Sequence, residues 1–125
     1  MIIESVSNQN FKLINKLKKK KYRDKENLFI IESRKLVDEA IASSADIDFI
    51  FLREGVSYEN QGKTLVFSET LFNKLSSMSS PDGIGAVIKK QKPRDLSSEK
   101  ILLLDGINDP GNIGTMIRSA EAFGF

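Results

Sequence analysis

The last 25 residues, 101–125, constrain this chain more than any other segment. Ile101–Leu104 is a continuous apolar run, the pattern of a parallel strand that is covered on both faces. Asp105 follows at its carboxyl end, where α/β sheets place their ligands. Asp109 and Pro110 then suit the N-cap and the first turn of a helix. The segment therefore predicts the opening strand, glycine-rich turn and helix of an α/β domain, and the sequence stops before such a domain could be complete.

The composition limits the kinds of protein and of chemistry that the chain can represent. At 125 residues, with 40% apolar side chains, it suits one ordinary domain with a real core. The absence of Cys and His excludes a disulfide framework and a thiolate metal site and removes the commonest general base, so we expect no bound metal. No run approaches the ~18 apolar residues of a membrane span, and no secretion signal is evident. A cytoplasmic protein with no membrane partner is the simplest interpretation.

Strands and helices alternate across residues 1–90, which predicts an α/β sandwich with helices covering a small sheet. Helices are expected to begin at Ser7 or Asn8, at Ser33 and at Ser68, because these side chains can cap exposed backbone amides. Strands are expected at residues 28–32, 47–53, 64–68 and 84–89. The polar segment Lys89–Lys100 reads as a connection between domains. We therefore predict a first domain over residues 1–92, a linker over 93–100 and the start of a second domain over 101–125.

A basic segment differs in charge from the rest of the chain. Residues 16–25 contain seven Lys or Arg and one Asp, a net charge of +6, whereas the other residues together carry −4. Such a stripe on an acidic body suggests one place that contacts a polyanion, although most charge runs are plain solvated faces. We expect a single first helix to present four of these side chains to solvent at spacings of three and four residues, namely Lys16, Lys19, Lys20 and Arg23.

Two polar side chains of the C-terminal segment are candidates for chemistry. Gly111 and Gly114 leave the helix amides open to a substrate, and Asn112 offers both a donor and an acceptor in the first turn. Arg118 follows about 9 Å further along the helix, and its side chain would lean back toward the turn. The alternative is an ordinary strand–helix unit in which the glycines serve packing and Arg118 is a surface charge.

The same segment resembles a known motif. The order Asp-Pro-Gly-Asn-x-Gly at 109–114, Arg-x-Ala at 118–120 and Phe-Gly at 123–124 is similar to the first signature motif of the SpoU (TrmH) family of RNA ribose methyltransferases. Weaker cues, Tyr22-Arg23, Phe29–Glu32 and Gly83–Val87, resemble that family's substrate-binding domain. One position departs from the pattern, since a Gly usually follows the Glu and this chain has Ser33. The resemblance spans nearly the whole chain but about half of the family's full length.

The resemblance implies an enzyme that transfers a methyl group from S-adenosylmethionine to a ribose 2′-hydroxyl of ribosomal or transfer RNA. The implied fold is a small α/β/α sandwich, similar to RNA-binding ribosomal proteins, followed by the opening strand and helix of a knotted α/β domain that forms a homodimer. By the motif match, Asn112 and Arg118 are the polar pair beside the target ribose, and Arg118 is the expected catalytic residue. Because an arginine is a poor base, binding a phosphate or stabilising charge on the ribose oxygen suits it better.

The family's later motifs, which hold the methyl donor, have no counterpart here. We therefore expect no cofactor-binding residue in this chain, and neither tight S-adenosylmethionine binding nor methylation by these residues alone. Within a domain that resembles an RNA-substrate module, the basic segment is the expected RNA contact. Its candidate residues, with one from the next helix, are Lys16, Lys19, Lys20, Lys21, Arg23 and Arg34. The loops near 32–34 and 79–83 are the alternative RNA contacts.

Two other functions fit parts of the sequence. A free-standing RNA-binding module without catalysis explains the fold and the basic segment but leaves the C-terminal motif without a role. A protein-interaction domain would use Ile101–Leu104 as a strand that pairs with a partner. One strand and one helix cannot bury their own apolar faces, so residues 101–125 are expected to be disordered, packed on the first domain or paired with another chain.

Overall fold

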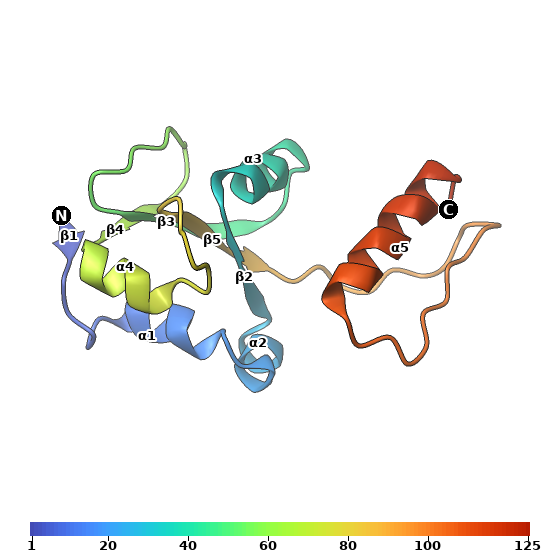
Figure 1. Ribbon diagram of the computed structural model, residues 1–125, viewed down its shortest axis with the longest axis horizontal. Coiled ribbons are helices and arrows are strands. Elements are labelled where there is room, and N and C mark those ends of the chain that lie inside the picture. The colour runs from blue at the N-terminus through green and yellow to red at the C-terminus, as the bar shows by residue number, and fades with distance from the viewer. The chain divides into compact units, whose positions relative to one another are not determined.

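The computed structural model describes residues 1–125 and divides them into two compact units, Met1–Gln91 and Lys92–Phe125. The first unit contains nine elements, shown in Figure 1: β1 (Ile2–Ile3), α1 (Gln9–Lys16), α2 (Lys20–Glu26), β2 (Leu28–Glu32), α3 (Arg34–Ala42), β3 (Ile47–Arg53), β4 (Thr64–Phe67), α4 (Glu69–Leu75) and β5 (Ile84–Lys89). The second unit contains α5 (Pro110–Ala122). No helix of the structure is both long enough and apolar enough to cross a membrane.

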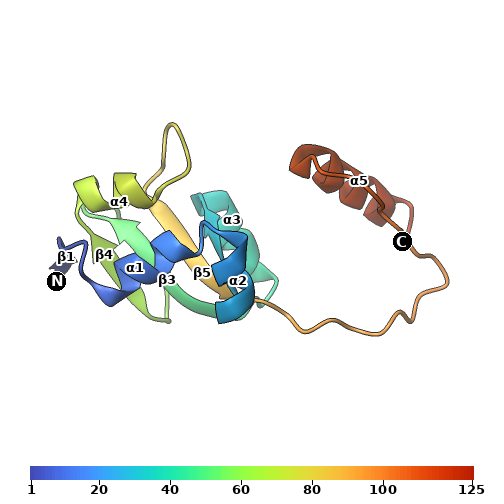
Figure 2. The same cartoon turned by 90° about the horizontal axis from the view of Figure 1, so that it is seen from below.

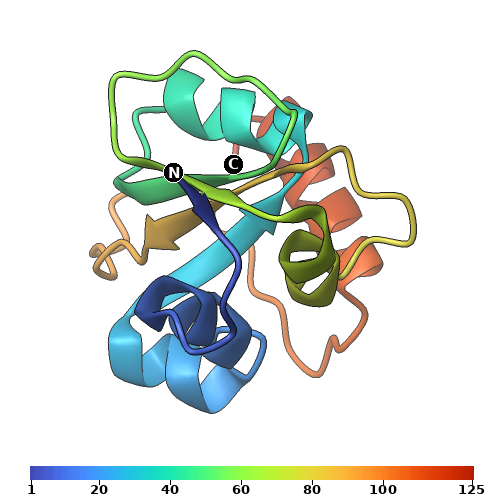
Figure 3. The same ribbon diagram turned by 90° about the vertical axis from the view of Figure 1, so that its left-hand side faces the viewer.

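The first unit is built on one mixed sheet with the strand order β1-β4-β3-β5-β2. β1, β4 and β3 run parallel, and β5 runs antiparallel to both of its neighbours, β3 and β2. Figure 3 shows the sheet from its edge, with α3 on one face and α1, α2 and α4 on the other. Figure 2 shows α1 and α4 on the same face of the sheet. This three-layer α/β/α sandwich confirms the predicted fold of the first domain.

Two apolar clusters hold the helices to the sheet, one on each face. The larger cluster joins α1 and α4 to the sheet through ten buried side chains, five of them Phe. The rings of Phe51 and Phe72 lie 5.8 Å apart, and Phe67 lies 6.4 Å from both Phe51 and Phe11. The smaller cluster packs Val37 of α3 against the opposite face. Alternate residues of a strand point to opposite faces, so β3 contributes to both clusters.

Three helices of the first unit, α1, α3 and α4, begin where the sequence predicts. The Asn8 side chain accepts hydrogen bonds from the backbone N–H groups of Asn10 (2.9 Å) and Phe11 (3.2 Å), which confirms it as the N-cap of α1. Ser33 and Ser68 cap α3 and α4 in the same way, through their hydroxyl oxygens. These caps satisfy amides that have no partner inside the helix.

The basic segment is not the single helix that the sequence predicted. α1 ends at Lys16 and α2 begins at Lys20, because Lys19 adopts an extended backbone with φ −100° and ψ 132°. The Arg23 side chain stabilises this break, since its Nη1 donates to the carbonyl oxygens of Leu17 (3.0 Å) and Lys18 (2.8 Å). Carbonyls at a helix end lack partners within the helix, and a guanidinium supplies one.

In the second unit the predicted helix forms and the predicted strand does not. Asp109 caps α5 by accepting a hydrogen bond from the Gly111 N–H (2.9 Å), and Pro110 occupies the first turn. Ile101–Leu104 has no strand pairing, so that expectation was wrong for this structure. A strand needs a neighbour for its backbone N–H and C=O groups, and the second unit contains none. No residue of α5 is buried.

Candidate functional site

A cleft of about 510 Å³ opens on the α1 and α4 face of the sheet, above the edge strand β2. Its apolar lining consists of the partly buried Phe29 and Ile30 of β2, with the buried Leu17 after α1 and Leu75 at the end of α4 behind them. The cleft exists because α1 and α4 pack over the middle of the sheet and leave part of β2 uncovered. Its polar residues are Lys18, Arg23, Glu32 and Ser77.

Glu32 places a carboxylate in this cleft at the end of an apolar strand. Leu28 and Ile30 pack against the α1 and α4 cluster, and Glu32, two residues on, faces the same side. Its Oε2 accepts a hydrogen bond of 2.9 Å from the backbone N–H of Ser77, in the loop after α4. This bond fixes the carboxylate against the loop and leaves acceptor capacity on both oxygens.

Two cations share the cleft with Glu32 without pairing to it. The Lys18 Nζ donates to the carbonyl oxygen of Lys74 (2.7 Å) in the last turn of α4, a position where helix carbonyls favour a cation. The Arg23 guanidinium is held by the carbonyls that follow α1. The ion pairs of the chain involve other residues, Lys20–Asp24, Lys90–Asp24 and Lys89–Asp46. The cleft therefore presents positive and negative groups side by side.

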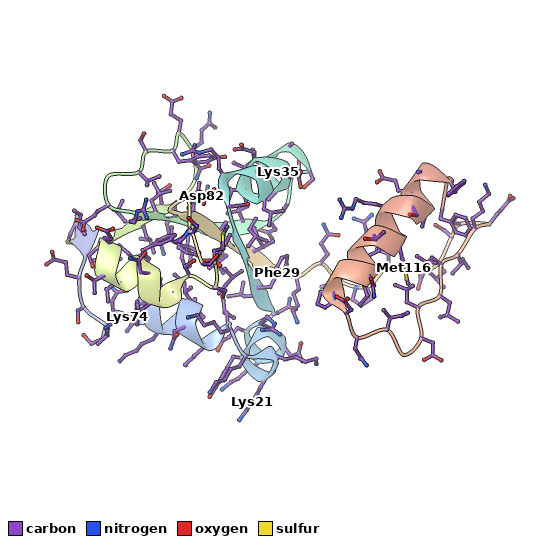
Figure 4. All side chains as sticks on the ribbon, viewed as in Figure 1. Lys21, Phe29, Lys35, Lys74, Asp82 and Met116 are labelled. Atoms are coloured by element: carbon purple, nitrogen blue, oxygen red, sulfur yellow. The ribbon has the colours of Figure 1, made fainter.

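The exposed lysines of the basic segment lie beside this cleft. Lys16 and Lys21 each place Nζ 5.7 Å from the centre of the Tyr22 ring, so the end of α1 and the start of α2 present their charges together. Lys19, between them, is exposed. Figure 4 shows Lys21 extending from α2 away from the sheet.

Lys20 differs from its neighbours because it is paired. Its Nζ lies 2.7 Å from one oxygen of Asp24, and Lys90 lies 2.7 Å from the other. The hydrogen bonds from Lys20 and Lys90 lower the pKa of Asp24 from its ordinary 3.8 to about 2. The Lys20–Asp24 contact lies within α2, whereas the Lys90–Asp24 contact joins α2 to the end of β5. The sequence did not reveal the second contact, because Asp24 and Lys90 are 66 positions apart.

Arg34 lies on α3, across the sheet from the basic segment. Its Nη2 donates to the Ser57 carbonyl (3.1 Å), and its guanidinium lies 5.1 Å from the centre of the Tyr58 ring. The Tyr58 hydroxyl in turn donates a hydrogen bond to Asp38. The pKa of Tyr58 is raised, mainly by burial and to a lesser extent by this hydrogen bond. The structure therefore separates Arg34 from the other candidate RNA contacts.

Asn112 and Arg118 are both exposed on α5, and the structure does not bring them together. Six positions on a helix separate two side chains by about 9 Å along the axis and about 120° around it. The hydrogen bonds near them involve other groups, from the Thr115 hydroxyl to the Gly111 carbonyl and from Lys100 to the Phe123 carbonyl. No cluster of three or more His, Cys, Asp or Glu side chains that could hold a metal ion is present.

Sequence reasoning did not identify the cleft as a site. Lys18 and Ser77 were not among its candidates, and Glu32 entered only as part of a motif and a loop. A usable signal was present, because the alternation Leu28, Ile30, Glu32 puts a carboxylate on the core side of a strand. A charge at such a position requires a partner or a ligand.

Comparison with known proteins identifies relatives over the whole chain. Residues 8–86 match the family described as the MRM3-like substrate binding domain. The chain is 36% identical over 126 aligned residues to the 23S rRNA (guanosine(2553)-2′-O)-methyltransferase RlmP of Bacillus subtilis (strain 168). That alignment covers 98% of this chain and 51% of the relative, so the chain spans about half of the relative's length.

Solved structures give the same result. A putative RNA methyltransferase of the TrmH family from Porphyromonas gingivalis superimposes with a TM-score of 0.77 at 29% identity, covering 97% of this chain and 51% of that one. An AdoMet-bound rRNA methyltransferase from Sinorhizobium meliloti gives a TM-score of 0.71 at 25% identity, covering 99% and 51%. The chain therefore belongs to the SpoU (TrmH) family, and its residues 8–86 form an MRM3-like substrate-binding domain.

Proposed function

We propose that this chain supplies the RNA-binding part and the first catalytic motif of an enzyme that methylates ribose 2′-hydroxyls of ribosomal RNA. The observation that carries the proposal is the 36% identity to the B. subtilis 23S rRNA enzyme, which extends over 98% of the chain. The alignment therefore includes both the sandwich and the segment with Asn112 and Arg118. A free-standing RNA-binding module would not account for similarity in that segment.

The basic segment of α1 and α2 is the proposed contact for the RNA backbone. Lys16, Lys19 and Lys21 are exposed and form no ion pair, so phosphates can replace their counterions without breaking an ion pair of the fold. Lys20 and Arg23 have internal partners, and we propose that they support the segment and add positive potential. Arg34, on the other side of the sheet, is the weakest of the candidates.

Asn112 and Arg118 are the proposed catalytic pair. S-adenosylmethionine supplies the methyl group when bound. The Asn112 amide would orient the ribose through hydrogen bonds, and the permanent charge of Arg118 would bind a neighbouring phosphate and stabilise the oxygen as its proton leaves. Residues 92–125 bury no side chain and so enclose no site for the methyl donor by themselves. We propose that other parts of a cytoplasmic homodimeric enzyme hold it.

The RNA contact is tested with a fragment of 23S rRNA that contains the guanosine numbered 2553 in the B. subtilis enzyme's name. Binding is measured by fluorescence anisotropy at several salt concentrations. Replacing Lys16, Lys19 and Lys21 with Ala should flatten the slope of log affinity against log salt by about 2–3 units, since each phosphate contact contributes about 0.7–0.9. The matched control replaces three other exposed lysines, Lys35, Lys63 and Lys92. Equal effects of both triple variants would contradict this surface.

The catalytic assignment is tested in the complete enzyme by methyl transfer and RNA binding in parallel. Arg118→Ala should lower the rate of transfer by about 10²–10³, the usual effect of removing one group that stabilises developing charge. Arg94→Ala, which removes the same charge from an exposed position outside the motif, is the control. Loss of RNA affinity without loss of rate at saturating RNA would assign Arg118 to binding alone.

A further inference from the structure

The carboxylate of Glu32 accepts a hydrogen bond from the Ser77 N–H, and this bond does not account for a negative charge beside the proposed RNA-binding surface. Glu32 lies in a cleft that also contains Lys18 and Arg23, and beside the exposed lysines of α1 and α2. Phosphates are repelled by a carboxylate, so Glu32 does not serve the RNA backbone. Neither cation of the cleft forms an ion pair with it. A carboxylate of this kind is suited to accept hydrogen bonds from an uncharged group of the ligand.

The cleft has the size of a site for one flat ring system. Its volume of about 510 Å³ lies within the range of about 300–1,000 Å³ that is typical of small-molecule sites. The partly buried side chain of Ile30 gives it an apolar surface, backed by the buried Leu17 and Leu75. Its polar residues are Lys18, Arg23, Glu32 and Ser77. Sequence-specific RNA recognition mainly uses unpaired bases whose faces pack on the protein and whose edges form hydrogen bonds.

The chemistry of Glu32 selects among the four bases. Guanine alone presents two adjacent donors on one edge, N1–H and the N2 amino group, and these match the two oxygens of a carboxylate. Uracil places carbonyl oxygens on both sides of its single N–H, and adenine and cytosine each place an acceptor beside their amino group. The Ser77 N–H already holds Oε2 at 2.9 Å, so Glu32 is fixed before a ligand arrives.

Arg23 is fixed in the same way. All of its side-chain hydrogen bonds come from Nη1, to the carbonyls of Leu17 and Lys18, so its remaining donors are available to a phosphate or a carbonyl oxygen. We propose that this cleft binds an unpaired guanine of the substrate RNA, with Glu32 accepting from N1–H and N2–H and Arg23 holding the adjoining backbone. This inference rests on the proposed function, in which the domain binds RNA.

The test measures the affinity of the full 125-residue chain for short single-stranded RNAs of uridines with one central nucleotide. That nucleotide is guanosine, inosine, which lacks the N2 amino group, or adenosine. The wild-type chain should bind the guanosine RNA about 10-fold more tightly than the inosine RNA, within the usual value of a good bidentate base contact.

Glu32→Gln is the informative variant, because its amide oxygen still accepts from the Ser77 N–H while its NH₂ opposes the donors of guanine. We expect it to lose about 10-fold in affinity for the guanosine RNA and to bind guanosine and inosine RNAs equally. Glu26→Gln removes the same charge from an exposed position on α2 and should keep the preference for guanosine. The Ser77 amide resonance in ¹H–¹⁵N spectra reports whether the loop is intact in each variant.

The outcomes separate this inference from the function on which it rests. Lysine-dependent RNA binding without a preference for guanosine would overturn the guanine site and leave the RNA-binding function standing. A preference that survives Glu32→Gln would also overturn it, because another group would then read the base. Absence of any RNA binding would reject both.

Discussion

At the scale of single residues, Ser33 adopts a backbone conformation that is essentially reserved for glycine. Its φ of 100° and ψ of 146° fall in a region that costs other residues about 1–3 kcal/mol. Ser33→Gly removes this strain. The substitution also has two costs, the lost hydroxyl cap on the Leu36 N–H and the greater freedom of the unfolded chain, and these two costs amount to about 1 kcal/mol. We therefore expect Ser33→Gly to raise the free energy of unfolding in urea by about 1 kcal/mol.

The matched variant is Ser33→Ala, which loses the hydroxyl cap and keeps the Cβ that causes the strain. It should lower the free energy of unfolding by about 0.5–2 kcal/mol. If both variants proved equally destabilising, the hydroxyl would dominate and the strain would be small. The conformation also explains why a glycine is usual at this place in the family pattern.

Gly85 lies in the sheet between two residues that matter for the core and the cleft. Its Cα partners are Glu32 on β2 and Phe51 on β3, and a Cβ at this position would come within 2.8 Å of a Phe51 ring carbon. The Phe51 ring is buried and packed on Phe67 and Phe72, so it cannot move away freely.

Gly85→Ala is therefore expected to lower the free energy of unfolding by about 1–3 kcal/mol, the usual cost of overpacking a core. Urea denaturation measures this loss. Gly114→Ala is the control and should not lower the free energy of unfolding. Nothing lies within 4 Å of the added Cβ, and Ala favours a helix over Gly by about 1 kcal/mol. An unchanged unfolding midpoint for Gly85→Ala would mean that the Phe51 ring tilts aside without cost.

The candidate site was only partly predictable at this scale. The exposure of Lys16, Lys19 and Lys21 is what their charge alone predicts, whereas the helical spacing expected for Lys16, Lys19, Lys20 and Arg23 is interrupted at Lys19. The internal roles of Arg23 and Arg34 were not predictable, because each depends on carbonyl groups whose positions are set by a helix break or by a distant loop. A one-dimensional pattern records that a cation is present and does not record what lies within its reach.

At the scale of elements, the sequence predicts what is determined locally. Caps at Asn8, Ser33, Ser68 and Asp109 involve neighbours two or three residues away, and all four were expected. The break between α1 and α2 was missed, since a run of lysines favours a helix and the turn at Lys19 is stabilised by Arg23. The strand at Ile101–Leu104 was predicted from apolar content, whereas pairing requires a second strand.

α2 is joined to the end of β5 by the ion pair of Asp24 with Lys90, and the strength of this pair depends on pH. The pKa of Asp24 is lowered to about 2 by its hydrogen bonds to Lys20 and Lys90. A carboxyl with a depressed folded-state pKa stabilises the fold fully above its ordinary value of 3.8 and loses that contribution as the pH falls toward 2. Because Lys20 is largely exposed and the Asp24 side chain is about half exposed, the contribution is small and screened by salt.

We expect the carboxyl carbon of Asp24 to titrate near 2 in NMR spectra at low salt, and at a higher pH when salt is added. Asp24→Asn should reduce the loss of stability between about pH 4 and pH 2, because the titrating group is gone. Asp46→Asn is the control, since its pair with Lys89 is longer, at 3.5 Å. A titration of Asp24 at its ordinary value would show that the bridge is not populated in solution.

At the scale of the whole molecule, burial is concentrated in the first unit. Every buried apolar residue lies between Phe11 and Ile88, and both clusters are formed by elements of Met1–Gln91. In the second unit, α5 buries no residue. Because apolar burial is the dominant favourable contribution to folding, the stability of the sandwich should not depend on residues 92–125.

We therefore expect a chain that ends at Gln91 to unfold in urea at the same midpoint and with the same denaturant dependence as the 125-residue chain. Both tyrosines, Tyr22 and Tyr58, lie in the first unit, so tyrosine fluorescence follows its unfolding alone, while far-ultraviolet circular dichroism records the loss of α5. Phe72→Ala, which opens a cavity in the larger cluster, should destabilise both chains equally, by about 3–5 kcal/mol. A lower midpoint in the shorter chain would show that residues 92–125 contribute burial to the sandwich in solution.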